Sequence, residues 1–589
     1  MRGPTESERS GAHGFARPAF SAAHGAADRQ WLSLAYTAVA LLSLAAFLTL
    51  FLFRAQDDNR LTSWRWVFAD ADVFWITPVL AAGLFLAAVL ARLPFPGRRS
   101  AGLLFLFSFA VAAVSWGEPE VIVDASRYFT QAKHLELYGL EHFFHEWGGQ
   151  IAAWTDLPLI PLLYGLIFSL AGENRIYIQG FTTLLFSTSV VLTYLIGGTL
   201  WDEATGFYAG ALLLGMPYLL TQVPLMLVDV PTMFFLLLAV FTTLKALERG
   251  GGGRLALASV AVALAFWTKY SAWLFLSVLL VVLLVRLKQG PRPVVRRALL
   301  LIVLSMVLIG ATLPPMLEVV GAQLRLLHSY QLPGLARWEE SPVSTFLFQM
   351  HPFIAVFALV SVYAAFKNKD ARCAIVLWLP ALVLVLGINR IRYILPVFPM
   401  LVLMAAYGLR QIRCAEIRKY IVLCIVASSV ALSVLGFRPF LQQTSAVNLK
   451  QAGEYLDFLD ASEVEVIALQ QRYAAVNPAV AVPLLDLYTS KRLIFRSNGL
   501  APTGRGVDES SLRFTWEYRN PKYYDAGAGG PKAEAVVVIA DDEAQPLPDR
   551  IAQRLGAYRL SRQFIASENV FGYRTIVKVY LAGHYPQQG

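Results

Sequence analysis

The sequence contains many apolar runs long enough to cross a lipid bilayer, and this feature constrains the fold more than any other. A helix needs ~20 apolar residues to span the ~30 Å hydrocarbon core. Hydrophobic residues make up 57% of the 589 and charged residues 15%, whereas soluble domains are about half apolar and about a quarter charged. We therefore expect a polytopic membrane protein. Fourteen candidate runs lie at about 31–53, 74–92, 101–116, 156–172, 176–199, 207–222, 230–247, 254–268, 270–287, 297–315, 343–366, 372–388, 393–409 and 419–437.

The loops between these runs differ sharply in their basic residues. Cytoplasmic loops of membrane proteins are enriched in Lys and Arg, so this difference predicts on which side each loop lies. One group carries 17 Lys or Arg in 44 positions and is predicted to be cytoplasmic: 92–100, 248–254, 286–297, 367–372 and 410–419. The other carries 7 in 93 positions and is predicted to be outside: 54–73, 117–155, 223–229 and 316–342.

Three runs lie between the outer loops 117–155 and 223–229, and these loops fall on the same side only if one of the three does not cross. The run 156–172 is the weakest, because it has 17 residues and includes Asp156, Pro158 and Pro161. We expect it to lie at the outer interface or to re-enter the membrane. Thirteen transmembrane helices then remain in the cell (inner or plasma) membrane, with a cytoplasmic N-terminus and an extracytoplasmic C-terminal domain.

Charge and cysteine content exclude other classes of protein. The formal net charge is +10, but the basic residues fall in short loops, where membrane insertion explains them, so no nucleic-acid partner is expected. The three cysteines, Cys373, Cys414 and Cys424, lie in or beside apolar runs and do not indicate a disulfide framework. The sequence has no Walker-type loop, dinucleotide fingerprint or zincin motif, so ATP-driven transport is unsupported.

The composition divides the chain into four parts. From residue 438 onward it becomes ordinary for a globular domain, with β-branched runs at 464–467 and 536–540 and a helix-like stretch at 545–557, which predicts a small α/β domain. The stretches 501–506 and 526–531 are predicted to be loops. The parts are a disordered tail (1–30), an added transmembrane hairpin (31–100), a catalytic membrane domain (101–437) with outer loop 117–175, and the C-terminal domain (438–589), here called the closing domain.

Ionisable residues at the outer membrane boundary are the candidates for function, because charge at membrane depth is costly. The first cluster contains Asp124, Arg127 and Tyr128 in the first long outer loop. Asp124 is the strongest functional candidate in this cluster. The alternative is that Asp124 only caps the helix that follows.

A second acid, Asp229, lies at the outer end of an apolar hairpin. Its alternative role is also that of a cap, because Pro231 follows in a position that favours the start of a helix. The two interpretations carry equal weight at this stage.

Two basic clusters face the same side. Arg390 and Arg392, followed by Tyr393, lie at the outer mouth between two runs. Arginine there runs against the usual charge bias, so an anionic partner is the better explanation. Lys269 occupies a tight outer turn, where snorkelling of its long side chain is the alternative.

A group of His and Glu residues in the first outer loop invites a metal interpretation. His142 and His145 are spaced like neighbours on a helix, with Glu146 beside them. Interfacial helices commonly carry such residues on their wet face, and Trp147 and Trp154 fit an aromatic belt. The solvated-helix interpretation is preferred over the metal site.

The order and sidedness of these motifs resemble the GT-C superfamily of membrane glycosyltransferases. The resemblance rests on Asp124, Asp229, the Thr-Lys pair ending in Lys269, and the Arg-Tyr-Ile-Leu-Pro-Val-Phe-Pro segment at 392–399. It is closest to the protein mannosyltransferase and aminoarabinose transferase branch, glycosyltransferase family 39, and covers roughly 101–437. The family also has a Pro-containing interfacial segment similar to the one that begins at Trp154.

Two departures limit what the resemblance implies. Many relatives have Asp-Glu in the first loop, whereas Ala125 follows Asp124 here, so the role of a second carboxylate is absent or supplied elsewhere. The runs at 31–53 and 74–92 precede the family-like part and have no evident purpose.

The resemblance implies transfer of a sugar from a polyprenyl phosphate to a protein, lipid or glycan acceptor at the outer leaflet. Phosphate leaves as a stable anion, so one carboxylate that takes the acceptor proton is enough for an inverting displacement. Asp124 is the candidate base. Asp229 would orient a substrate or share a divalent metal with Asp124, and no cofactor is certain.

The departing phosphate needs cations in a site with little water. The candidates for this role are Arg390 and Arg392, with Lys269 or Arg127 as further candidates, and Tyr128 and Tyr393 are expected to bind substrate beside them. A lipid or solute transporter is the main alternative, but it would place ionisable residues near the bilayer midplane. A non-catalytic anchor for the closing domain would not need thirteen spans.

Overall fold

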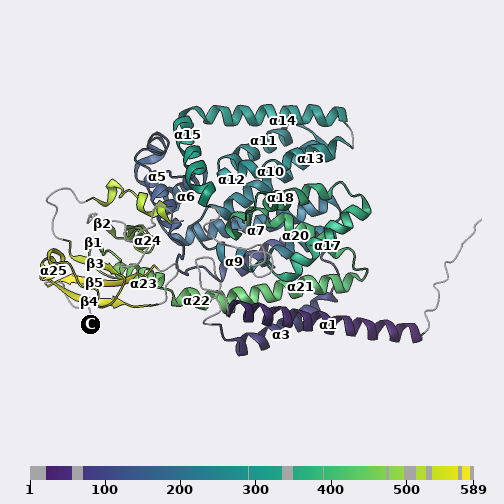
Figure 1. Cartoon of the computed structure of the whole chain (residues 1–589), viewed down its shortest axis with the longest axis horizontal. Helices are drawn as coiled ribbons and strands as arrows, with labels where there is room; N and C mark the ends of the chain where they lie inside the picture. Colours follow the sequence, from purple (N-terminus) through teal and green to yellow (C-terminus); the bar gives the residue numbers. More distant parts are fainter. Residues whose placement is uncertain are drawn as a thin grey trace, which may run out of the picture.

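The chain folds into a bundle of helices with a small sheet domain at one end (Figure 1). The computed structural model describes residues 22–55, 71–288, 291–334, 349–388, 390–471, 476–495, 512–525, 533–567 and 573–583. Most of the loop 54–73 and the predicted loops 501–506 and 526–531 lie outside the described residues. We call the end of the bundle that carries the closing domain the outer end. Which side of the membrane it faces stays a prediction.

The apolar runs form helices. Those of the membrane bundle are α1 (Ala22–Ala55), α3 (Val73–Ala91), α4 (Ser100–Ala113), α7 (Arg175–Leu200), α8 (Glu203–Leu213), α9 (Pro217–Gln222), α10 (Asp229–Arg249), α11 (Gly252–Phe266), α12 (Tyr270–Phe275), α13 (Val278–Leu287), α14 (Pro291–Thr312), α17 (Pro352–Asn368), α18 (Cys373–Val385), α19 (Ile391–Ile394), α20 (Phe398–Leu409) and α21 (Ala415–Leu432).

The apolar character of these helices has two different causes. Within the described residues, eight helical segments are long and apolar enough to cross a membrane. In the segment 391–409, 94% of the most apolar window is buried inside the protein, against 22% in α1, α3 and α14. The segment 391–409 is therefore apolar because it packs at the centre of the protein, whereas α1, α3 and α14 are apolar because they face lipid. The fold class is confirmed, whereas the count of thirteen stays a prediction.

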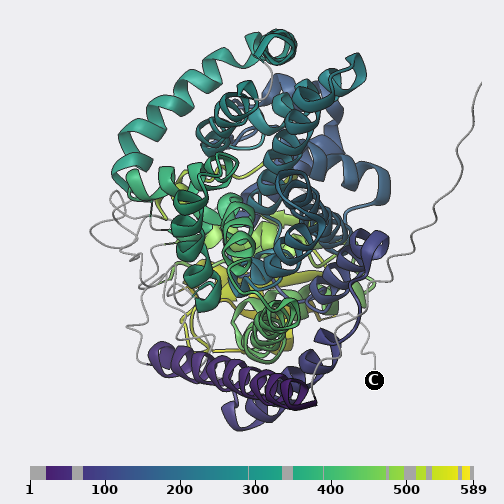
Figure 2. The same ribbon diagram turned by 90° about the vertical axis from the view of Figure 1, so that its right-hand side faces the viewer.

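The bundle is seen nearly end-on in Figure 2, with the purple α1 at its margin. This first hairpin packs against α21, where the hydroxyl of Tyr36 donates to Glu416 at 2.6 Å and its ring lies 4.4 Å from that of Tyr420. The helix α1 begins at Ala22, within the segment 1–30 that was predicted to be a disordered tail. Residues 1–21 lie outside the described residues.

The first outer loop forms two helices, α5 (Asp124–Glu146) and α6 (Leu159–Ala171). Gly139 interrupts α5 with a φ of 82°, a conformation that glycine adopts without strain. With 13 residues, α6 covers roughly 20 Å at the helical rise, short of the hydrocarbon core. Since α18 also has 13 residues, length alone does not decide whether α6 crosses, and its interfacial placement stays a prediction.

The closing domain combines helices with a five-stranded mixed sheet, in agreement with the predicted α/β domain. Its strand order is β2-β1-β3-β5-β4, with parallel pairing among the first three strands and antiparallel pairing in the rest. Both predicted β-branched runs form buried central strands, β1 and β3. The elements are β1 (Glu463–Ala468), β2 (Arg492–Phe495), β3 (Ala535–Ala540), β4 (Tyr558–Phe564), β5 (Ile576–Ala582), α22 (Arg438–Gln443), α23 (Ala446–Asp457), α24 (Ala481–Asp486) and α25 (Asp549–Leu555).

The closing domain is tied to the first outer loop by charged and polar contacts. The Lys133 ammonium on α5 lies 2.7 Å from the Asp486 carboxylate at the end of α24 and 3.0 Å from that of Glu173. The hydroxyl of Tyr524 donates to Asp486 at 2.6 Å. The backbone N–H of Glu120 donates to the Tyr488 hydroxyl at 2.7 Å. These contacts place the closing domain directly over the N-terminal half of α5.

Candidate functional site

The guanidinium of Arg392 lies between the two predicted aspartates and joins them. Its Nε donates to Asp229 Oδ2 at 2.7 Å, and its Nη1 donates to Asp124 Oδ2. The three residues come from α19, α10 and α5, which are far apart in the sequence. The folded chain thus brings together the two acids and one of the two outer arginines that the sequence singled out.

Asp229 pairs with a second cation. Lys269 is the residue that precedes α12. Its ammonium lies 2.6 Å from Asp229 Oδ1 and 5.2 Å from the ring centre of Tyr393. Asp229 has a side-chain exposure of only 1%. Lys269 therefore points into the cluster instead of snorkelling to the interface.

Neither aspartate is a helix cap. Asp124 and Asp229 are the first helical residues of α5 and α10, and the cap positions are occupied by Val123 and Val228. A capping side chain accepts hydrogen bonds from backbone N–H groups of the first turn, but these two carboxylates receive arginine and lysine. The capping alternative is wrong for both residues.

Arg127 extends the cluster toward a third acid. Its Nη2 lies 3.7 Å from Asp124 Oδ1 and donates to Asp156 Oδ1 at 3.1 Å. Gln131 also donates to Asp156, at 3.1 Å to Oδ2. Tyr128 is buried, with its ring centre 5.3 Å from the Arg127 guanidinium. All residues of this part lie on α5 or on the turn before α6.

Arg390 lies beside Tyr393, and its positive charge also helps to lower the pKa of Asp124. Its Nη1 donates to the Tyr393 hydroxyl at 3.1 Å, and its guanidinium lies 4.9 Å from the centre of that ring. The Lys269 ammonium lies 5.2 Å from the same ring centre, so Tyr393 contacts both cations. Arg390 is half-buried, whereas Arg392 is buried.

A supporting network that the sequence did not reveal holds the loop before Asp229. The carboxylate of Glu120 accepts from Arg175 Nε at 3.0 Å and from the backbone N–H of Met226 at 2.9 Å. Arg175 Nη2 donates in turn to the carbonyl of Pro224 at 3.1 Å. The network fixes the backbone of the second outer loop, and so the direction in which Asp229 enters the site.

The charge state of Asp124 follows from its neighbours. Burial by itself would raise its pKa, but the positive charges of Arg392 and Arg127 outweigh burial and hold the pKa below the ordinary value. Asp124 is therefore ionised at neutral pH. An ionised carboxylate can accept a proton, which is the first requirement of a general base.

The histidines of α5 do not form the metal site that was weighed from the sequence. The rings of His134 and His142 lie 5.8 Å apart and nearly parallel, while the side chain of His145 is 82% exposed and 3.8 Å from Glu146. Within the described part of the chain, no three metal-binding side chains converge. Between Asp124 and Asp229 the structure places the Arg392 guanidinium, so a shared divalent metal gains no support from this arrangement.

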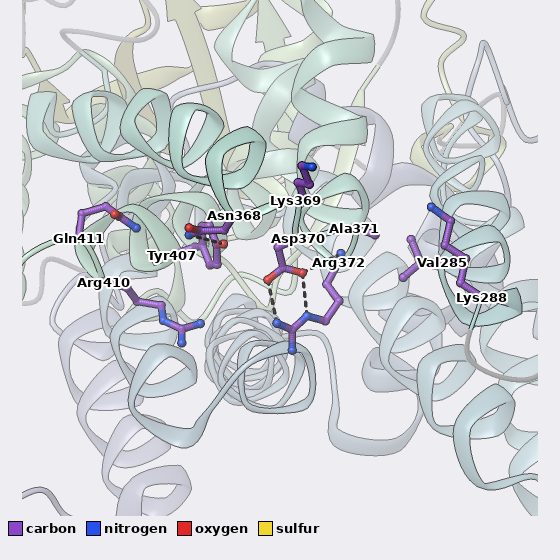
Figure 3. A pocket seen from close by; sticks show the side chains of 10 residues that line it. All are labelled: Val285, Lys288, Asn368, Lys369, Asp370, Ala371, Arg372, Tyr407, Arg410 and Gln411. Carbon is purple, nitrogen blue, oxygen red and sulfur yellow. Dashed lines mark hydrogen bonds and ion pairs between the residues drawn. The ribbon is translucent and has the colours of Figure 1, made fainter.

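A second charged region lies at the opposite end of the same helices. There a cavity of about 690 Å³ is lined by Val285, Lys288, residues 368–372, Tyr407, Arg410 and Gln411 (Figure 3). Nε and Nη2 of Arg372 donate to the two carboxylate oxygens of Asp370, each at 2.8 Å. Arg372 is 44% exposed, and Arg410 is also on the surface. Exposed cations of this kind are what membrane insertion alone predicts for cytoplasmic loops.

Comparisons with known proteins identify a related family and a related fold. Residues 156–313 match the family described as dolichyl-phosphate-mannose-protein mannosyltransferase. The structure of ArnT from Cupriavidus metallidurans bound to undecaprenyl phosphate matches with a TM-score of 0.54 and 13% identity, over 84% of this chain and 100% of that chain. This chain has the ArnT fold. ArnT from the same organism in the apo state matches with a TM-score of 0.51 and 13% identity, over 82% of this chain and 98% of that one. No curated protein matches the sequence significantly.

The resemblance to GT-C membrane glycosyltransferases predicted from the sequence is confirmed by the family match and the ArnT-like fold. Both support the prediction of a glycosyltransferase. The roles of the individual site residues stay predictions. Asp156 and Glu120 were missed as site residues because nothing in their local sequence distinguishes them from other interfacial acids.

Proposed function

We propose that the chain is a membrane glycosyltransferase that moves a sugar from a polyprenyl phosphate to an acceptor at the outer membrane face, with inversion at the anomeric carbon. The ArnT structure bound to undecaprenyl phosphate supports the class of lipid carrier. The acceptor is a protein, a lipid or a glycan. The site lies where helix ends meet the outer loop, as an enzyme that works at the membrane surface requires.

The observation that carries the proposal is the different accessibility of two paired acids. The side chain of Asp124 is 13% exposed, whereas that of Asp229 is 1% exposed and is enclosed by Lys269 and Arg392. A base must reach the proton that it removes. Asp124 is therefore the base, and Asp229 positions Arg392 and Lys269.

The reaction needs no further acid. Asp124 takes the proton of the acceptor hydroxyl. At the same time the oxygen of that hydroxyl forms a bond to the anomeric carbon of the donor sugar. The bond between that carbon and the phosphate oxygen breaks, and its electron pair leaves with the polyprenyl phosphate. Arg390 and Arg392 stabilise the charge that develops on this phosphate.

The pairing of Arg392 with Asp124 gives the donor a second role. An ion pair lowers the basicity of a carboxylate. A donor phosphate that attracts the Arg392 guanidinium competes with Asp124 for it. Binding of the donor thereby frees the carboxylate when it is needed, and Asp229 keeps Arg392 in place.

The test is a transfer assay with purified protein in lipid nanodiscs, supplied with polyprenyl phosphate hexoses and pentoses. We expect release of polyprenyl phosphate with at least one donor and a product of inverted anomeric configuration. Retention of configuration would contradict the single displacement. Absence of donor turnover with every sugar, including transfer to water, would contradict the function itself.

A further inference from the structure

A cavity of about 180 Å³ lies beside the site, between the first outer loop and the closing domain. One wall is formed by Ser126 and Arg127 at the start of α5 and by residues 148–149 and 152–154 of the same loop. The opposite wall is formed by Val480, residues 514–515 and residues 517–519 of the closing domain, and Leu326 completes the lining. The cavity therefore needs the closing domain to lie against the outer loop.

Arg127 connects this cavity to the reacting carboxylate. Its Nη2 lies 3.7 Å from Asp124, and its guanidinium lies 4.8 Å from the ring centre of Phe514 on the other wall. Within the described part of the chain, Nη1 of Arg127 is buried and has no hydrogen-bond acceptor. The Arg127 side chain as a whole is 14% exposed and lines the cavity, so a ligand there would contact this side chain close to Asp124.

Trp154 supplies an aromatic wall in an uncommon conformation. Its φ is 47°, in the left-handed region that side chains larger than glycine rarely occupy. Its ring lies 5.8 Å from that of Tyr330 and 6.3 Å from that of Phe514. Strained conformations of this kind persist where the surroundings hold them and gather at ligand sites.

The size and lining of the cavity define the class of ligand. The volume is below the ~300–1,000 Å³ of pockets for drug-sized molecules, so it holds one ring instead of a lipid chain. Trp154, Phe514 and Tyr518 contribute aromatic rings to the lining, Arg127 and Arg519 contribute hydrogen-bond donors, and Glu517 contributes an acceptor. A sugar ring presents the complementary surfaces, because its C–H face packs on aromatic rings while its hydroxyls accept hydrogen bonds.

We infer that this cavity binds a sugar ring of the acceptor, so that the chain glycosylates a glycan or glycolipid and not a bare peptide. The inference rests on the proposed function, since it assigns the acceptor of the same reaction. The acceptor hydroxyl then reaches Asp124 along Arg127. The closing domain selects the acceptor through residues 514–519.

The experiment compares two classes of acceptor in the nanodisc transfer assay. Alkyl mono- and disaccharides form one arm, and Ser/Thr-containing peptides form the other. We expect transfer to the alkyl glycosides and none to the peptides. Transfer to peptides alone would overturn the inference and leave the proposed function standing, whereas lack of donor turnover in every arm would overturn the function as well.

Variants of the cavity decide whether it is the acceptor site. Trp154→Leu and Arg519→Gln should each raise the KM for alkyl glycoside by about tenfold or more, and leave the donor KM and the transfer of sugar to water unchanged. Arg519 is exposed, so its variant should fold even if Trp154→Leu does not. The control is Arg492→Gln, which removes a surface ion pair with Glu463 elsewhere in the closing domain. An unchanged acceptor KM in Arg519→Gln and in folded Trp154→Leu would overturn the inference.

Discussion

The two ends of the helix bundle both collect charge, but they hold it differently. At the outer end Asp124, Asp229 and Arg392 have side-chain exposures of 13%, 1% and 7% and pair with one another. At the opposite end Arg372 is 44% exposed (Figure 3). Arg410, at the same end, is 37% exposed and lies beside Asp202. The segment 391–409 connects the two ends over roughly 27 Å at the helical rise.

The difference separates charge that membrane insertion explains from charge that it does not. An exposed cation at a helix end costs little and helps orient the chain. A buried ion costs several kcal/mol in lost hydration, and its partners repay this only in good geometry. Membrane topology alone therefore does not explain the outer cluster, which we propose to be catalytic.

The largest contrast between the ends is access from outside the cell. In a cysteine-free background, an introduced cysteine at exposed His145 should react fully with an impermeant thiol reagent, and one at exposed Arg292 should not react. The basic-residue difference between the loops is the physical reason. Labelling of position 292 from outside would reverse the topology and remove the outer site.

The next effect concerns the base. Asp124→Asn keeps the shape of the side chain but cannot take the proton, so turnover should fall roughly 10²–10⁴-fold. Asp370→Asn, which changes an acid at the opposite end, is the matched control and should leave turnover unchanged. Near-normal transfer by correctly inserted Asp124→Asn protein would make Asp229 the better candidate for the base.

Loss of an outer arginine should have a smaller effect. Charge-assisted hydrogen bonds contribute roughly 1.5–3 kcal/mol, so Arg390→Ala and Arg392→Ala should each weaken donor use by about tenfold or more. Arg→Lys should restore only part of this, because the planar fork is lost.

The control for this pair is Arg410→Ala at the opposite end, which should leave the donor KM as it is. Arg392→Ala also leaves two buried acids without their common partner, so thermal unfolding must be measured alongside. Unchanged donor dependence in both alanine variants would exclude the arginines as phosphate ligands.

The smallest effect tests how the closing domain is attached. Burial, with the nearby charge of Asp486, raises the pKa of Glu173 to about 9. Between these pH values Glu173 is protonated in the folded protein but would be ionised in the unfolded chain. This difference lowers the free energy of unfolding, and the loss grows as the pH rises from about 4.5 toward 9.

Glu173→Gln removes this cost, so it should raise the unfolding midpoint by a few degrees at pH 8 and hardly at all at pH 5. Differential scanning fluorimetry at both pH values measures this. The comparison variant is Glu463→Gln, an exposed acid of the closing domain, which should show no such pH dependence. An equal shift of the Glu173→Gln midpoint at both pH values would contradict a raised pKa.

Local sequence was enough to predict the membrane class, the helices and the central strands. Hydropathy and β-branched runs are sums over neighbouring residues, so they survive without knowledge of the fold. The same reasoning singled out Asp124, Asp229, Lys269 and Arg392, because charge beside an apolar run is costly wherever the run packs. It also singled out Arg390 and Arg392, because arginine on the predicted outer side runs against the usual charge bias of membrane proteins.

Only the tertiary structure decided how these residues act together. Arg392 joins acids that lie 268 and 163 positions away, and Arg127 meets Asp156, which lies 29 positions away. The cap and snorkelling alternatives could not be rejected earlier, since a carboxylate at a helix start serves either role until its partner is known. Ion pairs and cavities depend on which helices pack side by side, and that is set by the burial of whole helix faces and not by any local pattern.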